Sequence, residues 1–225
     1  MIAIIGSRGL IGNYLKNLVE YDYEFNSDNI QDIQEMDFDL VYIAAPTGNR
    51  LIVNANPEVD RKNIDRLVDC LSTVSIKTIV LIGTVDSVIR NHLSYGSNRL
   101  YLEEQVKQLC KNTYVLRLSS LIHKNITKNI LYDLKHNQYL DKINAESTLQ
   151  WYDLNNLVKD IEFSINNNLR ERNLVSEPIQ NQEIVDKFFN NTILAGTQVS
   201  AQYIEPVWYS KTDIFDSIAK YLNDQ

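Results

Sequence analysis

The chain has 225 residues, of which 44% are hydrophobic and 23% charged, a composition typical of a globular protein that can bury a core without disulfides. Its net charge of −7 disfavours binding to nucleic-acid polymers or anionic membranes, although one loop and one arginine suffice for a single phosphorylated ligand. No apolar run reaches the roughly 20 residues that span a bilayer. The apolar run at the start is too short for a signal peptide. We expect a cytoplasmic protein in which Cys70 and Cys110 are reduced thiols.

Strands and helices are predicted to alternate over the first half of the chain. Apolar runs predict strands at 2–5, 21–26, 39–45, 78–82 and 114–118, and helical spacing predicts helices at 10–20, 57–72 and 94–111. This alternation indicates an α/β fold, a doubly wound parallel sheet of the Rossmann-like type. Ligands of such a sheet bind beyond the carboxyl ends of its strands.

The alternation becomes less regular after residue 118. Helices are predicted at 126–137, 153–167, 181–189 and 212–222, with a short strand at 174–175 and an exposed Asn-rich connection at 164–173. We therefore expect a single nucleotide-binding domain over 1–225, in which residues from about 120 to 225 contribute a small, reduced C-terminal substrate lobe.

A glycine-rich turn joins the first predicted strand to the first predicted helix. Gly6, Gly9 and Gly12 lie in it, with two residues between successive glycines where the usual dinucleotide fingerprint has one and then two. Such a turn lets the backbone and a helix N-terminus approach a pyrophosphate. A tight turn without a ligand is the alternative. The turn is predicted to bind a dinucleotide through Gly6, Ser7, Arg8, Gly9, Leu10, Ile11 and Gly12.

The end of the second predicted strand bears on the choice of cofactor. No carboxylate lies clearly at its tip, where Asn26 and Ser27 are expected to contact the adenosine ribose. Arg8 is expected to point toward the same region, and a guanidinium binds phosphate oxygens in a bidentate manner. The sequence therefore favours NADP over NAD, which remains the alternative. Arg8 is otherwise a solvated side chain paired with Asp28.

Three further residues indicate proton-transfer chemistry. Thr84 ends the fourth predicted strand, and Tyr95 and Arg99 lie four residues apart on the following helix. A cation beside a phenol stabilises the tyrosinate and favours proton exchange with a carbonyl near neutral pH. The alternative is an aromatic–arginine pair on a helix surface. Thr84, Tyr95 and Arg99 are the predicted catalytic residues.

The pattern Gly6-xx-Gly9-xx-Gly12, Ala44-Ala45, Thr84 and Tyr95-xxx-Arg99 resembles the extended short-chain dehydrogenases/reductases, in particular the nucleotide-sugar epimerases and reductases. The resemblance covers 1–120 well and the rest thinly. It implies that Thr84 orients a substrate carbonyl, that Tyr95 is the proton donor, and that Arg99 holds the nicotinamide ribose. Arg99 departs from the family's usual Lys, and Arg117–His123 lacks the family's usual Pro and Gly.

The same resemblance assigns the remaining candidates. Further cofactor contacts are expected from Ala44, Ala45, Pro46 and Leu118, and substrate contacts from Asp86, Ser119, Gln150 and Trp151. For Gln150 and Trp151 the alternative is a turn packed by Trp151 before a helix capped by Asp153. His92, His123 and His136 share no ligand spacing, so no metal is expected.

The predicted function is that of an NAD(P)H-dependent reductase of a keto-sugar nucleotide. Val85-Asp86 follows Thr84 where the resembled dehydratases carry Asp-Glu, which disfavours dehydration. A nucleotide-sugar epimerase with bound NAD and a non-catalytic dinucleotide-binding regulatory protein are the alternatives. A homodimer is expected, for which Leu67, Leu100, Val106 and Leu109 form either the interface or the core.

Overall fold

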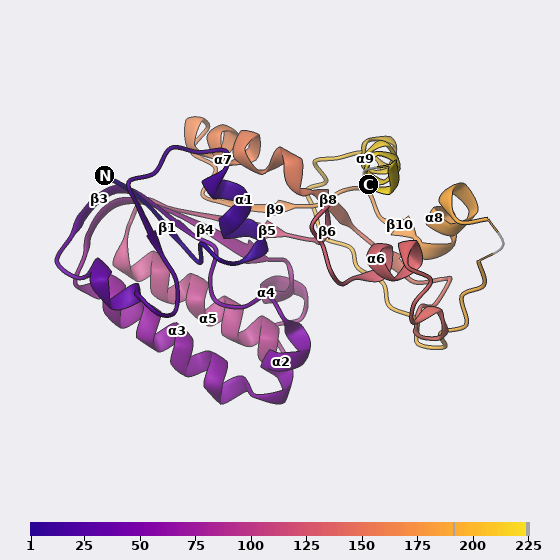
Figure 1. Cartoon of the computed structure of the whole chain (residues 1–225), viewed down its shortest axis with the longest axis horizontal. Helices are drawn as coiled ribbons and strands as arrows, with labels where there is room; N and C mark the ends of the chain where they lie inside the picture. The colour runs from indigo at the N-terminus through magenta and orange to yellow at the C-terminus, as the bar shows by residue number, and fades with distance from the viewer. Residues whose placement is uncertain (191, 224–225) are drawn as a thin grey trace. The chain divides into compact units, whose positions relative to one another are not determined.

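The computed structural model describes residues 1–190 and 192–223 (Figure 1). The chain divides into two compact units that interleave along the sequence. The first comprises Met1–Arg117 and Val158–Arg172, and the second comprises Leu118–Leu157 and the chain from Asn173 onward.

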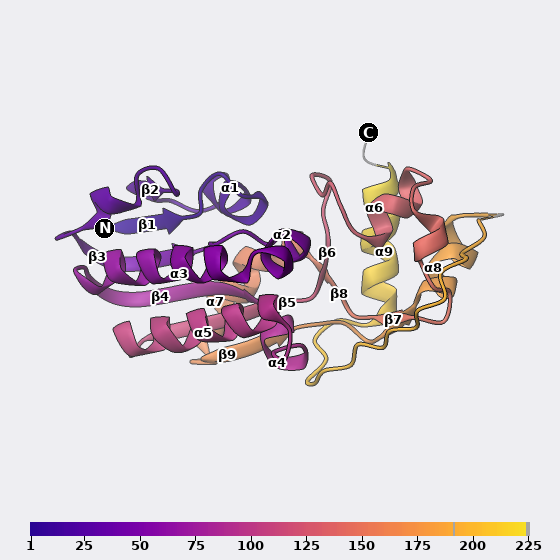
Figure 2. The same ribbon diagram turned by 90° about the horizontal axis from the view of Figure 1, so that it is seen from below.

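The first unit is built around a parallel six-stranded sheet with the order β2-β1-β3-β4-β5-β9 (Figure 2). Its strands are β1 (Ile2–Ile5), β2 (Tyr23–Phe25), β3 (Asp37–Ile43), β4 (Ser75–Thr84), β5 (Thr113–Leu118) and β9 (Glu171–Leu174). Its helices are α1 (Leu10–Lys16), α2 (Arg50–Ala55), α3 (Pro57–Ser72), α4 (Asp86–Ile89), α5 (Ser94–Leu109) and α7 (Leu157–Asn166), with a 3-10 turn at Ile30–Ile33. This architecture confirms the predicted Rossmann-like α/β fold.

Alternate residues of the central strands form the core under α3 and α5. Ala3 lies opposite Val41, and Val41 lies opposite Ile79. All three are buried in one cluster with Ile64 of α3 and Leu102 of α5. Because side chains alternate along a strand, the intervening residues point to the other face, which α1 and α7 cover (Figure 1). Burial of both faces explains why these strands are continuous apolar runs.

Three of the four apolar residues that the sequence left open between dimer interface and core pack inside the first unit, and the fourth, Leu100, is half-buried. Leu67 and Val106 are buried in the core cluster, and Leu109 packs against it. Cys70 and Cys110 are buried and free, as predicted. The homodimer remains a prediction, and the buried side chains of the core do not support it.

The predicted exposed connection at 164–173 is exposed over most of residues 166–171, but Ser164 and Arg172 near its two ends are buried. Ser164 is fully buried in α7, where its hydroxyl donates to the Asp160 carbonyl at 2.6 Å. Arg172 in β9 is also buried and pairs with the Asp160 carboxylate at 3.1 Å. The prediction fails at these two residues because their polar groups pair with Asp160, and burial of a polar group is tolerated when it is hydrogen-bonded.

The second unit is formed by short elements. These are β6 (Ser120–Ile122), α6 (Ile130–Lys135), a 3-10 turn at Leu140–Lys142, β7 (Thr148–Leu149), β8 (Trp151–Asp153), a 3-10 turn at Leu154–Asn156, β10 (Ile179–Gln180), α8 (Asn181–Phe188) and α9 (Lys211–Asn223). β6 pairs with β8 in parallel, and β7 pairs with β10 antiparallel. Asp153 caps the turn before α7, as predicted, by accepting from the Asn155 amide at 2.9 Å.

Candidate active site

The glycine turn between β1 and α1 is shaped by two very close backbone approaches. Gly6 has φ +87°, and a Cβ at this position would lie 2.3 Å from the Ala44 carbonyl oxygen. A Cβ on Gly12 would lie 2.1 Å from the Gly6 carbonyl oxygen. Gly9 differs, because its Cβ would meet only the Gly6 oxygen, at 3.4 Å. The fold therefore requires Gly6 and Gly12, whereas Gly9 leaves space open at the start of α1.

The same turn holds polar groups that the protein does not use. The first helical bond of α1 runs from the Asn13 amide to the Gly9 carbonyl at 2.8 Å, so the Leu10, Ile11 and Gly12 amides have no helical acceptor. The Ser7 side chain is 2% exposed, and its hydroxyl has no partner among the described residues. Unused donors around an open glycine position fit the pyrophosphate of a dinucleotide.

The residues after β2 form a compact polar turn. Arg8 pairs with Asp28, and both side chains are about two-thirds exposed. The hydrogen bond from Arg8 lowers the pKa of Asp28 below its usual value. The Asn26 side chain accepts from the Asp28 amide at 2.9 Å, and the Ser27 hydroxyl also donates to Asp28. The structure thus shows the Arg8–Asp28 pairing that the sequence gave as the alternative, on a guanidinium that solvent still reaches.

The glycine turn lies at the switch point of the sheet, where the order reverses between β1 and β3. The Ala44 amide donates to the Ile5 carbonyl at 2.8 Å, which joins the segment after β3 to the end of β1. Ala44, Ala45 and Pro46 are half-buried there. Crevices outside the carboxyl ends of strands at such a point are where open α/β sheets bind ligands. Leu118, at the end of β5, is 4% exposed.

The backbone segments that follow Thr84 and Tyr95 meet at the same edge. Thr84 is the last residue of β4, and Tyr95 is the second residue of α5. A Cβ on Gly96 would lie 2.5 Å from the Asp86 carbonyl oxygen, so the backbone after Tyr95 touches the backbone just after Thr84. The sequence missed this role of Gly96, which a glycine in the first turn of a helix indicates only weakly.

The Tyr95 hydroxyl lacks a hydrogen-bond partner within the described part of the chain. The side chain is 8% exposed, and its hydroxyl makes no hydrogen bond to any described residue. That oxygen lies 4.0 Å from the position that a Cβ on Gly48 would take, and it therefore borders the loop after β3. The Thr84 hydroxyl accepts from the Asp86 amide at 3.3 Å, so its own proton can be donated elsewhere.

Arg99 lies over the Tyr95 ring, and a second residue holds it there. Its Cζ is 4.7 Å from the ring centroid. Its Nη1 and Nη2 donate to the two carboxylate oxygens of Asp60 at 3.1 and 2.9 Å, and Nη2 also donates to the Thr47 carbonyl at 2.8 Å. Asp60 was missed, because an acid in the first turn of a helix is usually explained by the helix dipole. The predicted cation beside the phenol is present, and a buried carboxylate balances its charge.

The Asp86 carboxylate forms ion pairs with two arginines and is shielded from solvent. Its carboxylate is 2% exposed, with Oδ2 at 2.5 Å from Arg50 Nε and Oδ1 at 3.1 Å from Arg90 Nη1. Arg50 itself is half-exposed, and its Cζ lies 5.9 Å from the Tyr95 ring centroid. Sequence analysis did not identify Arg50, because the sequence of residues 50–55 does not predict that it lies beside Tyr95.

The remaining substrate candidates lie in the second unit. Ser119 donates to the Leu174 carbonyl at 3.1 Å. The Gln150 side chain is 0% exposed; it donates to the carbonyls of Ser176 and Ile204 at 2.8 and 3.0 Å and accepts from the Ile204 amide. Trp151 is 0% exposed. For Gln150 and Trp151 this is the packing role that the sequence gave as the alternative.

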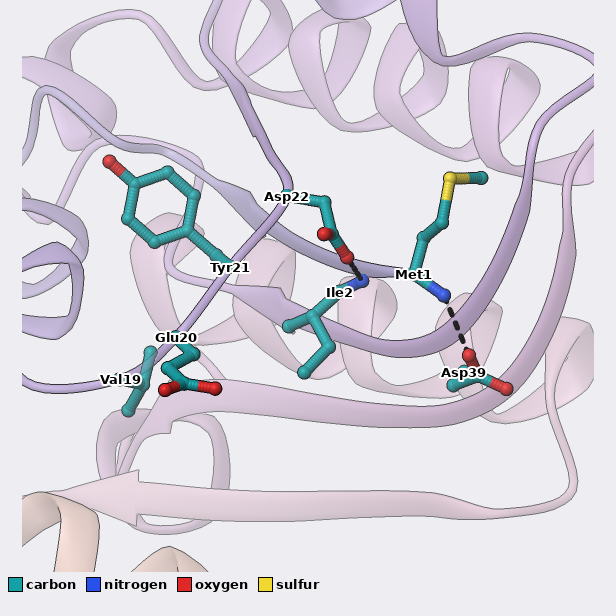
Figure 3. Close-up of a pocket in the computed structure, with 7 residues that line it drawn as sticks. All are labelled: Met1, Ile2, Val19, Glu20, Tyr21, Asp22 and Asp39. Atoms are coloured by element: carbon teal, nitrogen blue, oxygen red, sulfur yellow. Dashed lines mark hydrogen bonds and ion pairs between the residues drawn. The ribbon is translucent and has the colours of Figure 1, made fainter.

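A depression of about 830 Å³ lies at the opposite, amino-terminal edge of the sheet (Figure 3). Two of its three acidic side chains are already paired. Asp22 accepts from the Ile2 amide, and Asp39 accepts from the Met1 amino group, each at 2.6 Å. Lys77, with the Met1 amino group, lowers the pKa of Asp39 to about 2. Because ligands bind at the other edge of such sheets, this depression is not the candidate site. It is lined by Met1, Ile2, Val19, Glu20, Tyr21, Asp22 and Asp39.

Two other features were sought among residues 1–190 and 192–223. No helix there has both the length and the hydropathy needed to cross a membrane. Within the same residues, no three His, Cys, Asp or Glu side chains are grouped as metal ligands.

No protein-family model and no curated protein matches the sequence. Solved structures match the fold. A UDP-N-acetylglucosamine 4-epimerase from Bacillus cereus aligns with a TM-score of 0.69 at 15% identity, covering 98% of this chain and 97% of the other. MoeE5 in complex with UDP-glucose and NAD aligns with a TM-score of 0.73 at 11% identity, covering 98% and 97%.

A dTDP-4-dehydrorhamnose reductase from Clostridium acetobutylicum aligns with a TM-score of 0.66 at 14% identity, covering 99% and 98%. The capsular polysaccharide assembling protein CapF from Staphylococcus aureus is longer: at 19% identity and a TM-score of 0.60, the alignment covers 82% of this chain and 55% of that one. These likenesses show that the chain shares the fold of nucleotide-sugar epimerases and reductases.

Proposed function

We propose that the protein is an NAD(P)H-dependent reductase of a keto-sugar nucleotide, with Tyr95 as the proton donor. The observation that carries this proposal is the unbonded Tyr95 hydroxyl beside the loop after β3. It lies at the sheet edge where the glycine turn presents unused donors. Two structures that share the fold support the substrate class, since one is a dTDP-4-dehydrorhamnose reductase and another holds UDP-glucose and NAD.

Each of the residues at the candidate site has its own role in reduction of the substrate carbonyl. A bound reduced nicotinamide supplies the hydride. The Thr84 hydroxyl donates a hydrogen bond to the carbonyl oxygen and so orients it, since one of its lone pairs already accepts from the Asp86 amide. Tyr95 then transfers its proton to that oxygen. The Arg99 guanidinium lies over the Tyr95 ring, with its Cζ 4.7 Å from the ring centroid, and Asp60 fixes it in place.

Cofactor binding is assigned to the glycine turn and the segments after β2 and β3. The open position at Gly9 and the unpartnered Ser7 hydroxyl accommodate the pyrophosphate. Arg99 has five N–H donors and makes three hydrogen bonds to Asp60 and Thr47, which leaves part of its fork for the nicotinamide ribose. We propose NADPH as the reductant because Arg8 is exposed beside Asn26 and Ser27.

A thermal-shift comparison of NADPH with NADH tests the cofactor. A ligand at about 100-fold excess over its Kd adds roughly 2.7 kcal/mol to the free energy of unfolding. We expect the larger shift with NADPH. A larger shift in melting temperature with NADH would indicate that Arg8 only pairs with Asp28 and does not bind a phosphate of the cofactor.

Reduction is favoured over dehydration by the state of Asp86. Water elimination needs an acid and a base near Thr84, but both oxygens of Asp86 are held by Arg50 and Arg90. Epimerisation is the second candidate, because the same Thr–Tyr pair serves it and a UDP-N-acetylglucosamine 4-epimerase shares the fold. Protein purified with retained NAD would favour the epimerase, and an empty site the reductase.

The test of the central role is a Tyr95→Phe variant, with Tyr101→Phe as its control. Tyr101 lies on the same helix, but its hydroxyl donates to Asp65 at 3.0 Å. Loss of a general acid should lower kcat by about 10²- to 10⁴-fold, whereas Tyr101→Phe should leave kcat unchanged. Parental turnover in Tyr95→Phe would refute the role of Tyr95. Binding of NADPH without consumption, across a panel of keto-sugar nucleotides, would instead favour a regulatory protein.

A further inference from the structure

Arg50 presents an unused guanidinium edge beside Tyr95. It is the first residue of α2, and its side chain is 50% exposed. Its Nε contacts Asp86 Oδ2 at 2.5 Å, and its Cζ lies 5.9 Å from the Tyr95 ring centroid. Neither Nη atom makes a hydrogen bond to a described residue. The two terminal nitrogens are therefore available to a ligand.

The local charge favours an anion at this position. Arg90 also pairs with Asp86, so two guanidinium groups share one buried carboxylate and one positive charge is left in excess. Arg99 does not add to this excess, because Asp60 balances it. Arg50 is the more exposed of the two arginines on Asp86, at 50% against 26% for Arg90. The excess charge is thus most accessible at Arg50.

The position of Arg50 is fixed by contacts on both sides of it. The Asn49 side chain accepts from the Ile52 amide and caps α2. The Asn54 side chain accepts from the Tyr95 amide at 3.0 Å, which ties α2 to the start of α5. These two hydrogen bonds fix the start of α2, which carries Arg50, beside the start of α5, which carries Tyr95.

We propose that Arg50 is a specificity-determining residue that binds an oxyanion of the substrate close to the reacting carbonyl. The inference rests on the proposed function, because it places the substrate at Tyr95. A guanidinium fork matches a carboxylate or a phosphate in a bidentate manner. The oxyanion is therefore either a carboxylate on the sugar ring or a phosphate of the nucleoside diphosphate.

The test is calorimetric titration of the full chain and of Arg50→Gln with UDP-glucose, UDP-glucuronic acid and UDP. Arg170→Gln is the matched control. Arg170 is also exposed and lies over a tyrosine ring, with its Cζ 4.5 Å from the Tyr114 centroid. It precedes β9, and its carbonyl accepts from the Val115 amide, so it lies at the amino-terminal edge of the sheet, away from Tyr95. Melting temperatures confirm that both variants are folded.

If the sugar carboxylate is the source, the parent binds UDP-glucuronic acid about tenfold or more tightly than UDP-glucose. Arg50→Gln then removes that difference and leaves UDP-glucose unchanged. If a phosphate is the source, Arg50→Gln weakens all three ligands about equally. Both results support the proposal, provided that Arg170→Gln binds like the parent.

Two results would overturn it, and they are distinguishable. Parental affinities of Arg50→Gln for every ligand that binds would overturn the role of Arg50 and leave the proposed function standing. Failure of the parent itself to bind any of the three ligands would overturn both.

Discussion

The buried ion pair between Asp60 and Arg99 gives the sharpest test of how the candidate site is held together. Both side chains are at most 6% exposed. Asp60 accepts two hydrogen bonds from Arg99, at 3.1 and 2.9 Å, and one from the Asn98 amide group at 2.8 Å. Asp60→Asn keeps the size of the side chain but removes its charge and replaces one acceptor oxygen with a donor.

The expected cost follows from what the substitution leaves behind. Arg99 would remain buried with no opposite charge, and breaking a buried pair in this way costs about 3–5 kcal/mol. A typical domain has a free energy of unfolding of about 5–15 kcal/mol, so the loss is a large fraction of the total. Replacing both partners, as in Asp60→Leu/Arg99→Met, removes both desolvated charges and should recover most of the loss.

Urea unfolding followed by far-UV circular dichroism measures these differences, and hydrogen exchange in α3 and α5 localises them to the first unit. Asp28→Asn is the control, because the Arg8–Asp28 pair is about two-thirds exposed and should leave the unfolding midpoint nearly unchanged. A loss below about 1 kcal/mol in Asp60→Asn would refute the interpretation of a desolvated pair. A double variant no more stable than Asp60→Asn would show that the two side chains do not act together.

Two further predictions concern the glycine turn and the second unit. Gly9→Ala should keep the parental melting temperature, since its Cβ meets only one atom at 3.4 Å, but should weaken NADPH binding about tenfold or more by blocking the pyrophosphate. Gly6→Ala should be destabilised, because φ +87° and an approach of 2.3 Å to the Ala44 oxygen both exclude a Cβ. Thermal melts with NADPH titration measure the stability and the cofactor affinity of both variants. Equal effects at Gly6 and Gly9 would contradict the assignment of the pyrophosphate to the open position at Gly9. Burial lowers the pKa of His123 below its usual value of 6.5, with Lys124 acting in the same direction, so the unfolded chain binds the proton first as the pH falls. The stability of the second unit should therefore be full above about pH 6.5 and decrease below it. The fluorescence of Trp151 and Trp208, both in that unit, reports the change. His123→Gln should flatten the pH dependence, and an unchanged slope in that variant would assign it to other groups.

The sequence by itself determined the strands and the longer helices of the first half of the fold, but not the short helices α2 and α4. Hydrophobic periodicity and start signals are local properties, so the helix at Pro57–Ser72 and the strand at Ile2–Ile5 were predicted with the bounds that the structure shows. Glycine spacing and the Thr84–Tyr95–Arg99 pattern are local as well: the glycine turn follows β1, Thr84 ends β4, and Arg99 lies over the Tyr95 ring.

Only the tertiary structure decided which groups face one another at that edge. Asp60 is 39 residues from Arg99, Asn54 is 41 from Tyr95, and Asp86 is 36 from Arg50, so packing of α2, α3, α4 and α5 rather than local spacing brings them into contact. Tertiary contacts also explain why Arg172, in the segment predicted to be exposed, is buried: the fold brings its guanidinium to the Asp160 carboxylate. The sequence shows which side chains can form hydrogen bonds and ion pairs, and the tertiary structure determines whether their partners lie close enough to do so.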